Sequence, residues 1–218
     1  FLYNKKEKDT FLLDQIIKRF KFCNKIFIIS EKLKIVNKSI NFNRKSKVKI
    51  VYSKPTKNQI QSILKVSKFI GNNEKVIILN PDSNFDININ SFKNNYDGLI
   101  FNINKKDLRR NFGKKDIIYN NSKNKIVKIK KMARYPFAQK VSAGTYYLKK
   151  WKYFTQFSST IKNINRKDLQ VADVFLKIIK RKNIYLKEVK NFVCFENNKK
   201  VKEYKFWKNY FLNNFKLK

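Results

Sequence analysis

The chain has 218 residues, of which 42% are hydrophobic and 15% aromatic. A chain of this length and apolar content forms a domain with a real core, which excludes a disordered protein. The formal charge of +37 suggests a nucleic acid or an anionic membrane as partner. Only seven of the 52 basic residues are arginine, however, and the lysines are spread along the chain. We therefore attribute the charge mainly to a general bias in residue composition rather than to a binding surface. No apolar run approaches the ~20 residues of a membrane span, and without histidine or a C-x-x-C pair a zinc site is excluded.

Alternating elements are predicted for the first third of the chain. Apolar residues at helical spacing indicate helices over 10–22 and 59–70. Apolar or alternating runs indicate strands over 25–30, 47–53 and 76–79. This alternation is typical of a parallel sheet covered by helices.

The strand over 76–79 ends in Asn80-Pro81-Asp82. In an open α/β sheet, ligands bind beyond the carboxyl ends of the strands, so Asp82 marks a candidate nucleotide site. Asp82 could instead be a simple turn residue, because aspartate is favoured after proline in turns.

The second half of the chain is richer in strands. Predicted strands and helices follow in this order: strands over 97–103, 125–131 and 144–149, a helix over 168–182, a strand over 184–189 and a helix over 201–211. No internal repeat and no linker rich in Gly, Ser or Pro divides them, so we expect a single domain over 1–218.

Several segments follow one another in an order found in a known family. Thr56 to Leu64 is similar to a T-x-G-Q-A-x-S segment, 76–82 to a strand ending in N-x-D, 127–131 to V-x-x-x-E-K, and 142–147 to S-x-G-x-Y-x-F. The segments at 171–179 and 192–207 are similar to the helix near the family's end and to its closing segment. By the order and spacing of this set, over nearly its whole length, the chain resembles the sugar-1-phosphate nucleotidyltransferases (nucleotidyl transferase domain).

The resemblance implies a fold and a reaction. The fold class is α/β, a Rossmann-like three-layer sandwich with a mixed, mainly parallel sheet. The reaction joins a nucleoside triphosphate to a sugar 1-phosphate to make a nucleotide sugar, with Mg²⁺ as cofactor. Such chemistry depends on positioning and on positive charge around the phosphates rather than on a nucleophilic side chain.

The resemblance also implies roles for four residues. Asp82 matches the metal-binding and substrate-binding aspartate, and Lys131 matches the catalytic lysine that faces the sugar phosphate. Gly144 matches a glycine whose backbone lies against the sugar, and Gln59 lies near the position that reads the base. Each has a plainer interpretation: Lys131 as a solvated strand residue, Gly144 as a strand-packing residue and Gln59 as a polar residue in a first helical turn.

The chain departs from the family pattern at several points. The Gly-rich G-x-G-x-R loop and the P-K lysine do not occur in it, so we expect a domain without the first strand and the phosphate loop. Asn58 replaces a glycine, Lys130 replaces the glutamate of E-K, and Cys194 takes the place of a second metal-binding acid. Cysteine is a poor ligand for Mg²⁺. These departures indicate an impaired site or a specialised subfamily.

Three alternatives stay open at this point. The first is a non-catalytic relative that binds a nucleotide sugar or has a regulatory role. The second is a basic nucleic-acid-binding protein, whose affinity would fall steeply with salt. The third is a glycosyltransferase of the same fold, although Asp82-Ser83-Asn84 lacks the second acid of a D-x-D pair.

Two core thiols, Cys23 and Cys194, favour a reducing compartment, and we expect a cytoplasmic protein.

Overall fold

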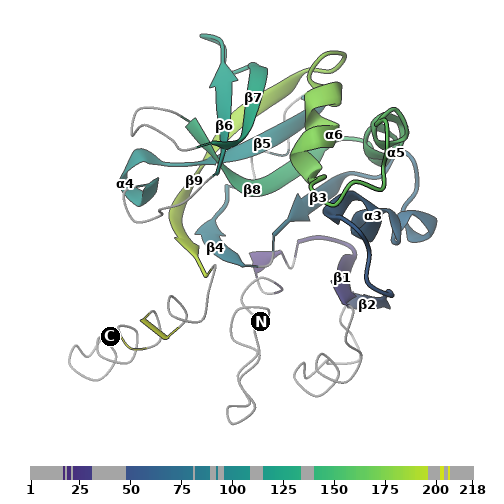
Figure 1. The fold of residues 1–218 in the computed structure, drawn as a ribbon. Helices are drawn as coiled ribbons and strands as arrows, with labels where there is room; N and C mark the ends of the chain where they lie inside the picture. Colours follow the sequence, from purple (N-terminus) through teal and green to yellow (C-terminus); the bar gives the residue numbers. More distant parts are fainter. Residues whose placement is uncertain are drawn as a thin grey trace.

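A computed structural model describes residues 17, 19, 20, 22–30, 48–80, 82–88, 92, 96–108, 115–133, 140–195, 202, 203 and 206 (Figure 1). The strands are β1 (Ile26–Ser30), β2 (Val48–Tyr52), β3 (Val76–Leu79), β4 (Ser83–Asp86), β5 (Gly98–Ile103), β6 (Lys115–Asn120), β7 (Ile126–Ala133), β8 (Lys140–Leu148) and β9 (Ile184–Cys194). The helices are α3 (Gln59–Leu64), the short 3-10 helix η1 (Ser67–Phe69), α4 (Lys105–Leu108), α5 (Trp151–Ser159) and α6 (Val171–Ile178). Over the described residues, none of these helices is long and apolar enough to span a membrane.

The main sheet has seven strands and is mixed. Its order is β4-β9-β5-β8-β6-β7, and β3 pairs with β8 beside this path. The expected α/β class with a mixed sheet is therefore confirmed. The balance differs from a mainly parallel sheet, since β5 and β9 are parallel whereas the other pairs are antiparallel. β8 lies in the middle of the sheet and runs against β3, β5 and β6, and the outer pairs β4–β9 and β6–β7 are antiparallel as well.

Two further strands form a small sheet of their own. β1 and β2 pair in parallel, with Ile26 opposite Val48, and lie close to α3 in Figure 1. The ring of Phe27 stacks on Phe69 of η1 at 5.9 Å between centroids. The sequence pattern predicted both strands but grouped them with β3, which pairs with β8 instead.

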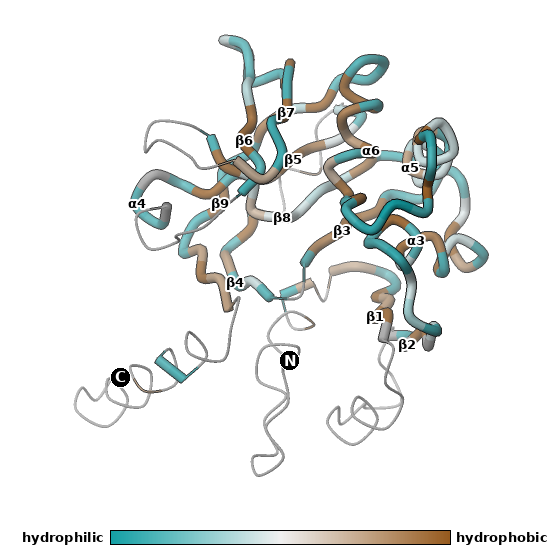
Figure 2. The backbone as a smooth tube through the Cα atoms, viewed as in Figure 1, coloured by the Kyte–Doolittle hydropathy of each residue, from teal (hydrophilic) through white to brown (hydrophobic). Residues whose placement is uncertain are grey.

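Two hydrophobic cores cover the two faces of the main sheet. On one face, Ile100 of β5 packs with Phe154 of α5 and Phe175 of α6. On the other face, the neighbouring Leu99 and Phe101 pack with Phe20 and other aromatic residues. Successive residues of a strand point to opposite faces, so the continuous apolar run of β5 is buried on both sides. Figure 2 shows hydrophobic residues running along strands such as β3 and hydrophilic residues in the connections around α5.

The predicted helices are shorter in the structure. The helix over 59–70 divides into α3 and η1, and the helix over 168–182 is reduced to α6. Both begin at defined caps: the Asn58 side chain accepts a hydrogen bond from Gln61 N at 3.0 Å, and Gln170 and Asp173 form a capping box. The strands β4 and β6 and helix α5 were not predicted. The helices predicted over 10–22 and 201–211 fall almost wholly outside the described residues.

Candidate functional site

One edge of β8 is shared by two strands, and the candidate site lies where they meet. β3 pairs with residues 145–148 of β8, and β6 pairs with Lys140 and Val141. Both run antiparallel to β8, so the carboxyl end of β3 points toward the first residue of β6. Asn80 N donates a hydrogen bond to Gly144 O at 3.2 Å, at the last position before the two strands separate.

A cavity of about 130 Å³ opens at this junction of β3, β6 and β8. Its lining residues lie in eight elements or directly beside them, and they are Gln59, Asn80, Asp82, Ser83, Lys115, Asp116, Met132, Ser142, Ala143, Gly144, Tyr146, Gln170 and Phe192. Pockets for whole small molecules usually measure about 300–1,000 Å³, so this cavity is smaller than a site that encloses a whole ligand.

A larger cavity, of about 560 Å³, lies elsewhere along β9 and is lined by residues such as Asn102, Lys187 and Glu188. None of the residues that the sequence singled out lines it. Size alone favours the larger cavity, but the chemistry at the end of β3 favours the smaller one, and we take the smaller cavity as the candidate site.

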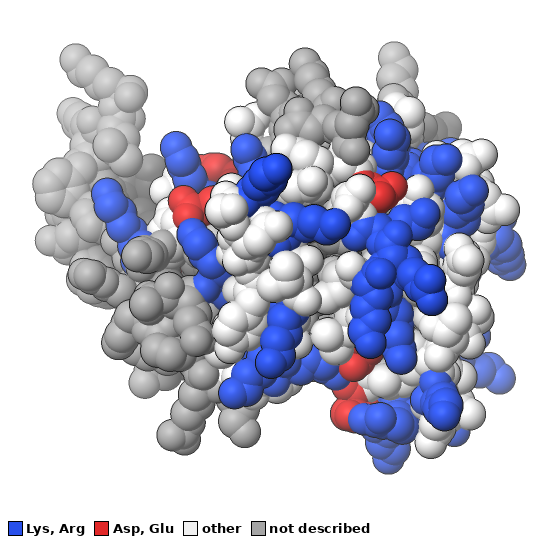
Figure 3. All heavy atoms as spheres, turned by 90° about the horizontal axis from the view of Figure 1, so that it is seen from above, with Lys and Arg blue, Asp and Glu red and all other residues white. Residues whose placement is uncertain are grey.

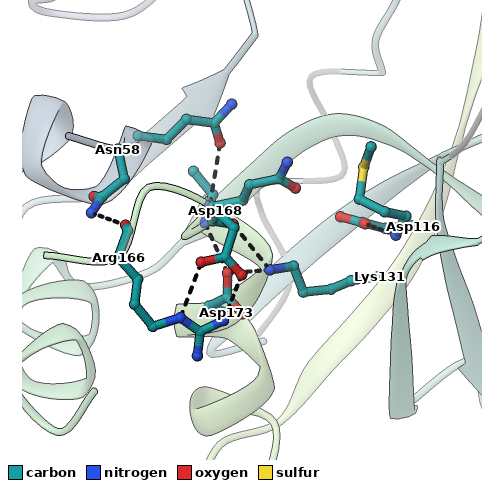
Figure 4. Close-up of polar contacts among 10 residues, drawn as sticks. Asn58, Asp116, Lys131, Arg166, Asp168 and Asp173 are labelled. Carbon is teal, nitrogen blue, oxygen red and sulfur yellow. Dashed lines mark hydrogen bonds and ion pairs between the residues drawn. The ribbon is translucent and has the colours of Figure 1, made fainter. Parts of the chain in front are cut away.

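Three of the four residues predicted from sequence line the smaller cavity together. They are Gln59 at the start of α3, Asp82 just before β4, and Gly144 in β8. Lys131, the fourth, is not among its lining residues. The Lys131 ammonium lies 2.5 Å from Asp173 Oδ2 and donates to Asp168 O at 3.4 Å (Figure 4).

A β-bulge explains the direction of Lys131. In the β6–β7 ladder, Lys115 pairs with Ala133 and Ile117 with Lys130, so Lys131 and Met132 together lie opposite Asp116. Met132 has a φ of 45°. A bulge re-aims the side chains on either side of it, and here Met132 faces the cavity while Lys131 contacts the start of α6.

A second irregularity places Gly144. Between the pairs Ile100–Tyr146 and Asn102–Ser142, three residues of β8 lie opposite one residue of β5. Gly144 has a φ of 70°, and a Cβ atom there would lie 2.8 Å from Asn80 Nδ2. Both the backbone conformation and the close approach of Asn80 require glycine. The fold itself therefore requires glycine at position 144, apart from any role of its backbone in contacting a ligand.

Asp82 is fixed where β4 meets β9. Its backbone oxygen accepts a hydrogen bond from Phe195 N at 2.6 Å, and its carboxylate accepts one from Ser83 Oγ at 3.3 Å. Ser83 pairs directly with Cys194. Cys194, which replaces a second acid in the sequence pattern, thus lies opposite the residue that follows Asp82.

The start of α6 closes the cavity on the side of Gln59. Gln59 Oε1 accepts a hydrogen bond from Val171 N at 3.4 Å. Asp173 accepts one from Gln170 N at 2.8 Å, which caps the helix, and its same oxygen pairs with Lys131. The Lys131–Asp173 pair therefore holds the β7 strand against the helix that carries Gln170.

Asp116 is a charged residue of the cavity that sequence reasoning missed. Its carboxylate accepts a hydrogen bond from Met132 N at 3.0 Å. Burial raises the pKa of the Asp116 carboxyl, opposed by that hydrogen bond and by the Lys131 charge. Burial and the Asp116 charge in turn raise the pKa of Tyr146, which keeps its hydroxyl protonated. The available signal was the run Asp116-Ile117-Ile118-Tyr119, which has the apolar centre of a short strand.

The donor set around Asp82 limits how a Mg²⁺ ion could be held. Among the described residues, no group of three or more His, Cys, Asp or Glu side chains could hold a metal. Mg²⁺ commonly binds through one or two carboxylates and takes its remaining ligands from substrate phosphates and water. Asp82 therefore fits an ion that enters with a triphosphate, and does not fit a preformed metal cage.

Comparisons with known proteins support the fold. No protein-family model and no curated protein matches the sequence. Among solved structures, a CTP:phosphocholine cytidylyltransferase from Streptococcus pneumoniae has a TM-score of 0.67 at 14% identity, over 93% of this chain and 85% of that one. A UDP-glucose pyrophosphorylase complexed with UDP-glucose has a TM-score of 0.66 at 14% identity, over 91% and 87%. A nucleoside-diphosphate-sugar pyrophosphorylase from Vibrio cholerae RC9 has a TM-score of 0.63 at 11% identity, over 88% and 84%.

These neighbours define the class of structure. The chain has the fold of the nucleotide-sugar pyrophosphorylases and cytidylyltransferases, as the sequence resemblance implied. At these identities the likeness concerns the fold, so function has to be argued from the cavity itself.

Proposed function

We propose that this protein is a nucleotidyltransferase that joins a nucleoside triphosphate to a phosphorylated substrate, with a sugar 1-phosphate as the first candidate. The observation that carries the proposal is the convergence of Gln59, Asp82 and Gly144 on one cavity at the end of β3. The three residues were selected from sequence for three roles in one reaction, and they come from separate parts of the chain.

The reaction requires an in-line displacement at phosphorus. An oxygen of the substrate phosphate attacks the α-phosphorus of the triphosphate, and the bond from that phosphorus to the bridging oxygen breaks. Pyrophosphate leaves with the bonding electrons. Bound Mg²⁺ would neutralise charge on the phosphate oxygens. Asp82 would hold the ion, the Gly144 backbone would lie against the substrate, and Gln59 would contact the base.

The proposal is tested by pyrophosphate release from the full chain with Mg²⁺, each nucleoside triphosphate and a panel of phosphorylated substrates. The panel includes phosphocholine, because one structural neighbour is a phosphocholine cytidylyltransferase. We expect release with at least one pair and its loss in Asp82→Ala. Asp86→Ala is the matched control, because Asp86 is an exposed carboxylate in the neighbouring strand β4. Equal release by both variants would contradict the proposal.

A second candidate is a non-catalytic relative that binds nucleotides. Two observations favour it: Lys131 is paired with Asp173 outside the cavity lining, and a cysteine, Cys194, lies opposite Ser83 where the sequence pattern expects an acid. Nucleotide binding without pyrophosphate release across the panel would identify this case. Both candidate functions imply a cytoplasmic location, where nucleoside triphosphates are abundant.

Nucleic-acid binding receives less support from the surface. On the face in Figure 3, lysine and arginine side chains are scattered and interleaved with uncharged residues and a few acids. A dedicated nucleic-acid site gathers positive charge into a stripe or patch, often with stacking aromatics. The scattered charge fits the compositional interpretation.

A further inference from the structure

Two lysines of the β6–β7 hairpin have different electrostatic surroundings. Lys131 pairs with a carboxylate, since its ammonium lies 2.5 Å from Asp173 Oδ2. Lys115, the first residue of β6, is the one lysine or arginine among the described residues that line the cavity. The salt bridges found within the described part of the chain do not involve Lys115.

The Lys115 ammonium contacts the strand that pairs with β4. Lys115 Nζ lies 3.6 Å from Cys194 Sγ, and Cys194 is buried and pairs with Ser83, the neighbour of Asp82. Sulfur is a weak acceptor, and an ammonium group has three donors, so at least two strong hydrogen bonds can still form. This contact is not with a carboxylate, so within the described residues the Lys115 ammonium is not held in a salt bridge.

We propose that the Lys115 ammonium is the cation that binds a phosphate group in this cavity, in the role that the sequence pattern gives to Lys131. This inference rests on the proposed function, because it names the residue that receives a phosphate of that reaction. The size of the cavity, about 130 Å³, suits one phosphate group rather than a whole ligand.

The other charges of the cavity make such a cation necessary. Asp82 and Asp116 line the same space, and both repel an entering phosphate when they are ionised. Lys115 offsets part of this repulsion at a half-buried position, where a charge-assisted hydrogen bond is stronger than at an exposed one.

The test is calorimetric titration of the full chain with inorganic phosphate, a single phosphate group like that of the proposed substrate, in the presence of EDTA. We expect Lys115→Met to weaken binding by about tenfold or more and Lys115→Arg to retain most of it. Lys130→Met is the matched control, since Lys130 is an exposed residue of β7 and its loss changes the net charge equally. We expect Lys130→Met and Lys131→Met to stay within about twofold of the unmodified chain. Thermal unfolding of each variant checks that it is folded.

Several outcomes would overturn the inference. They are equal affinities of Lys115→Met and Lys130→Met, a loss that follows Lys131→Met instead, or no binding of inorganic phosphate by the unmodified chain. Pyrophosphate release from nucleoside triphosphates is measured separately on the same samples. Release that persists in Lys115→Met removes only the role of Lys115, whereas no release from any sample removes the proposed enzyme.

Discussion

The cavity has two walls of different construction. The strand-end wall consists of Asn80, Asp82 and Gly144, and backbone geometry holds it in place. The hairpin wall consists of Lys115, Asp116 and Met132, with the Lys131–Asp173 ion pair behind it. Backbone bonds and a left-handed glycine fix the first wall, whereas buried or paired charges fix the second.

This difference separates what each wall can do. The strand-end wall presents a carboxylate and a close backbone approach at fixed positions, which suits holding a metal ion and a substrate. The hairpin wall contributes to the charge of the cavity through the Lys115 ammonium and the buried Asp116 carboxyl. Perturbing the first wall should therefore affect ligand chemistry and backbone strain, and perturbing the second should affect charge and stability.

The largest effect is expected at the strand-end wall from Asp82→Ala. Loss of the carboxylate removes the proposed protein ligand for Mg²⁺, and we expect pyrophosphate release to fall by about 100-fold or more. Initial rates over a range of Mg²⁺ concentrations measure the effect. A variant that recovers full activity at high Mg²⁺ would show that Asp82 sets only the affinity for the ion.

The next largest effect is expected on the free energy of unfolding, from Gly144→Ala in the same wall. The added methyl group meets Asn80 Nδ2 at 2.8 Å and the backbone keeps a φ of 70°, so we expect a loss of about 1–3 kcal/mol in the free energy of unfolding. Urea denaturation measures this loss. Adding Asn80→Ala should restore the part due to the clash and leave the part due to backbone strain. A single variant as stable as the unmodified chain would disprove the strained geometry.

A smaller effect is expected at the hairpin wall from Asp173→Ala. The change removes both the ion pair with Lys131 and the cap on Gln170 N, and we expect a loss of about 1–2 kcal/mol. Asp173→Asn keeps a capping oxygen and should lose less. Asp168→Asn is the control, because its pair with Arg166 is exposed and should contribute nothing measurable. Equal denaturation midpoints for Asp173→Ala and Asp168→Asn would contradict the role of the pair.

The smallest effect concerns pH and Asp116. Because burial raises the pKa of this carboxyl, the folded chain holds its proton more tightly than the unfolded chain does. The protonated Asp116 carboxyl therefore makes its full contribution to the free energy of unfolding at low pH. This contribution is lost as pH rises from about 4 through the raised pKa. Asp116→Asn should flatten that fall. Urea denaturation at a series of pH values compares the two slopes, and identical slopes would contradict the raised pKa.

The two walls also differ in how well the sequence predicts them. Asp82 and Gly144 belong to local patterns, a strand that ends in Asn80-Pro81-Asp82 and a glycine within a strand, and both line the cavity at the end of β3. The mixed sheet was implied by the resemblance to the sugar-1-phosphate nucleotidyltransferases, whereas the local patterns alone predicted a parallel sheet.

The hairpin wall depends on strand pairing and on a β-bulge, which local sequence patterns do not reveal. Strand β6, which carries Lys115 and Asp116, is short and was not predicted. The bulge at Lys131 and Met132 reverses which of the two side chains faces the cavity, and it is set by pairing with Asp116 across the hairpin. Lysines are abundant in this chain, so no sequence signal distinguishes Lys115 from Lys131.

The most direct test of the central claim is ³¹P NMR of the full chain with Mg²⁺, nucleoside triphosphates and phosphorylated substrates. The account predicts that signals of pyrophosphate and of a new diphosphate diester appear together in equal amounts with one pair of substrates. It also predicts that neither signal appears with Asp82→Ala. Absence of both signals with every pair, or their formation at the same rate by Asp82→Ala, would contradict the account.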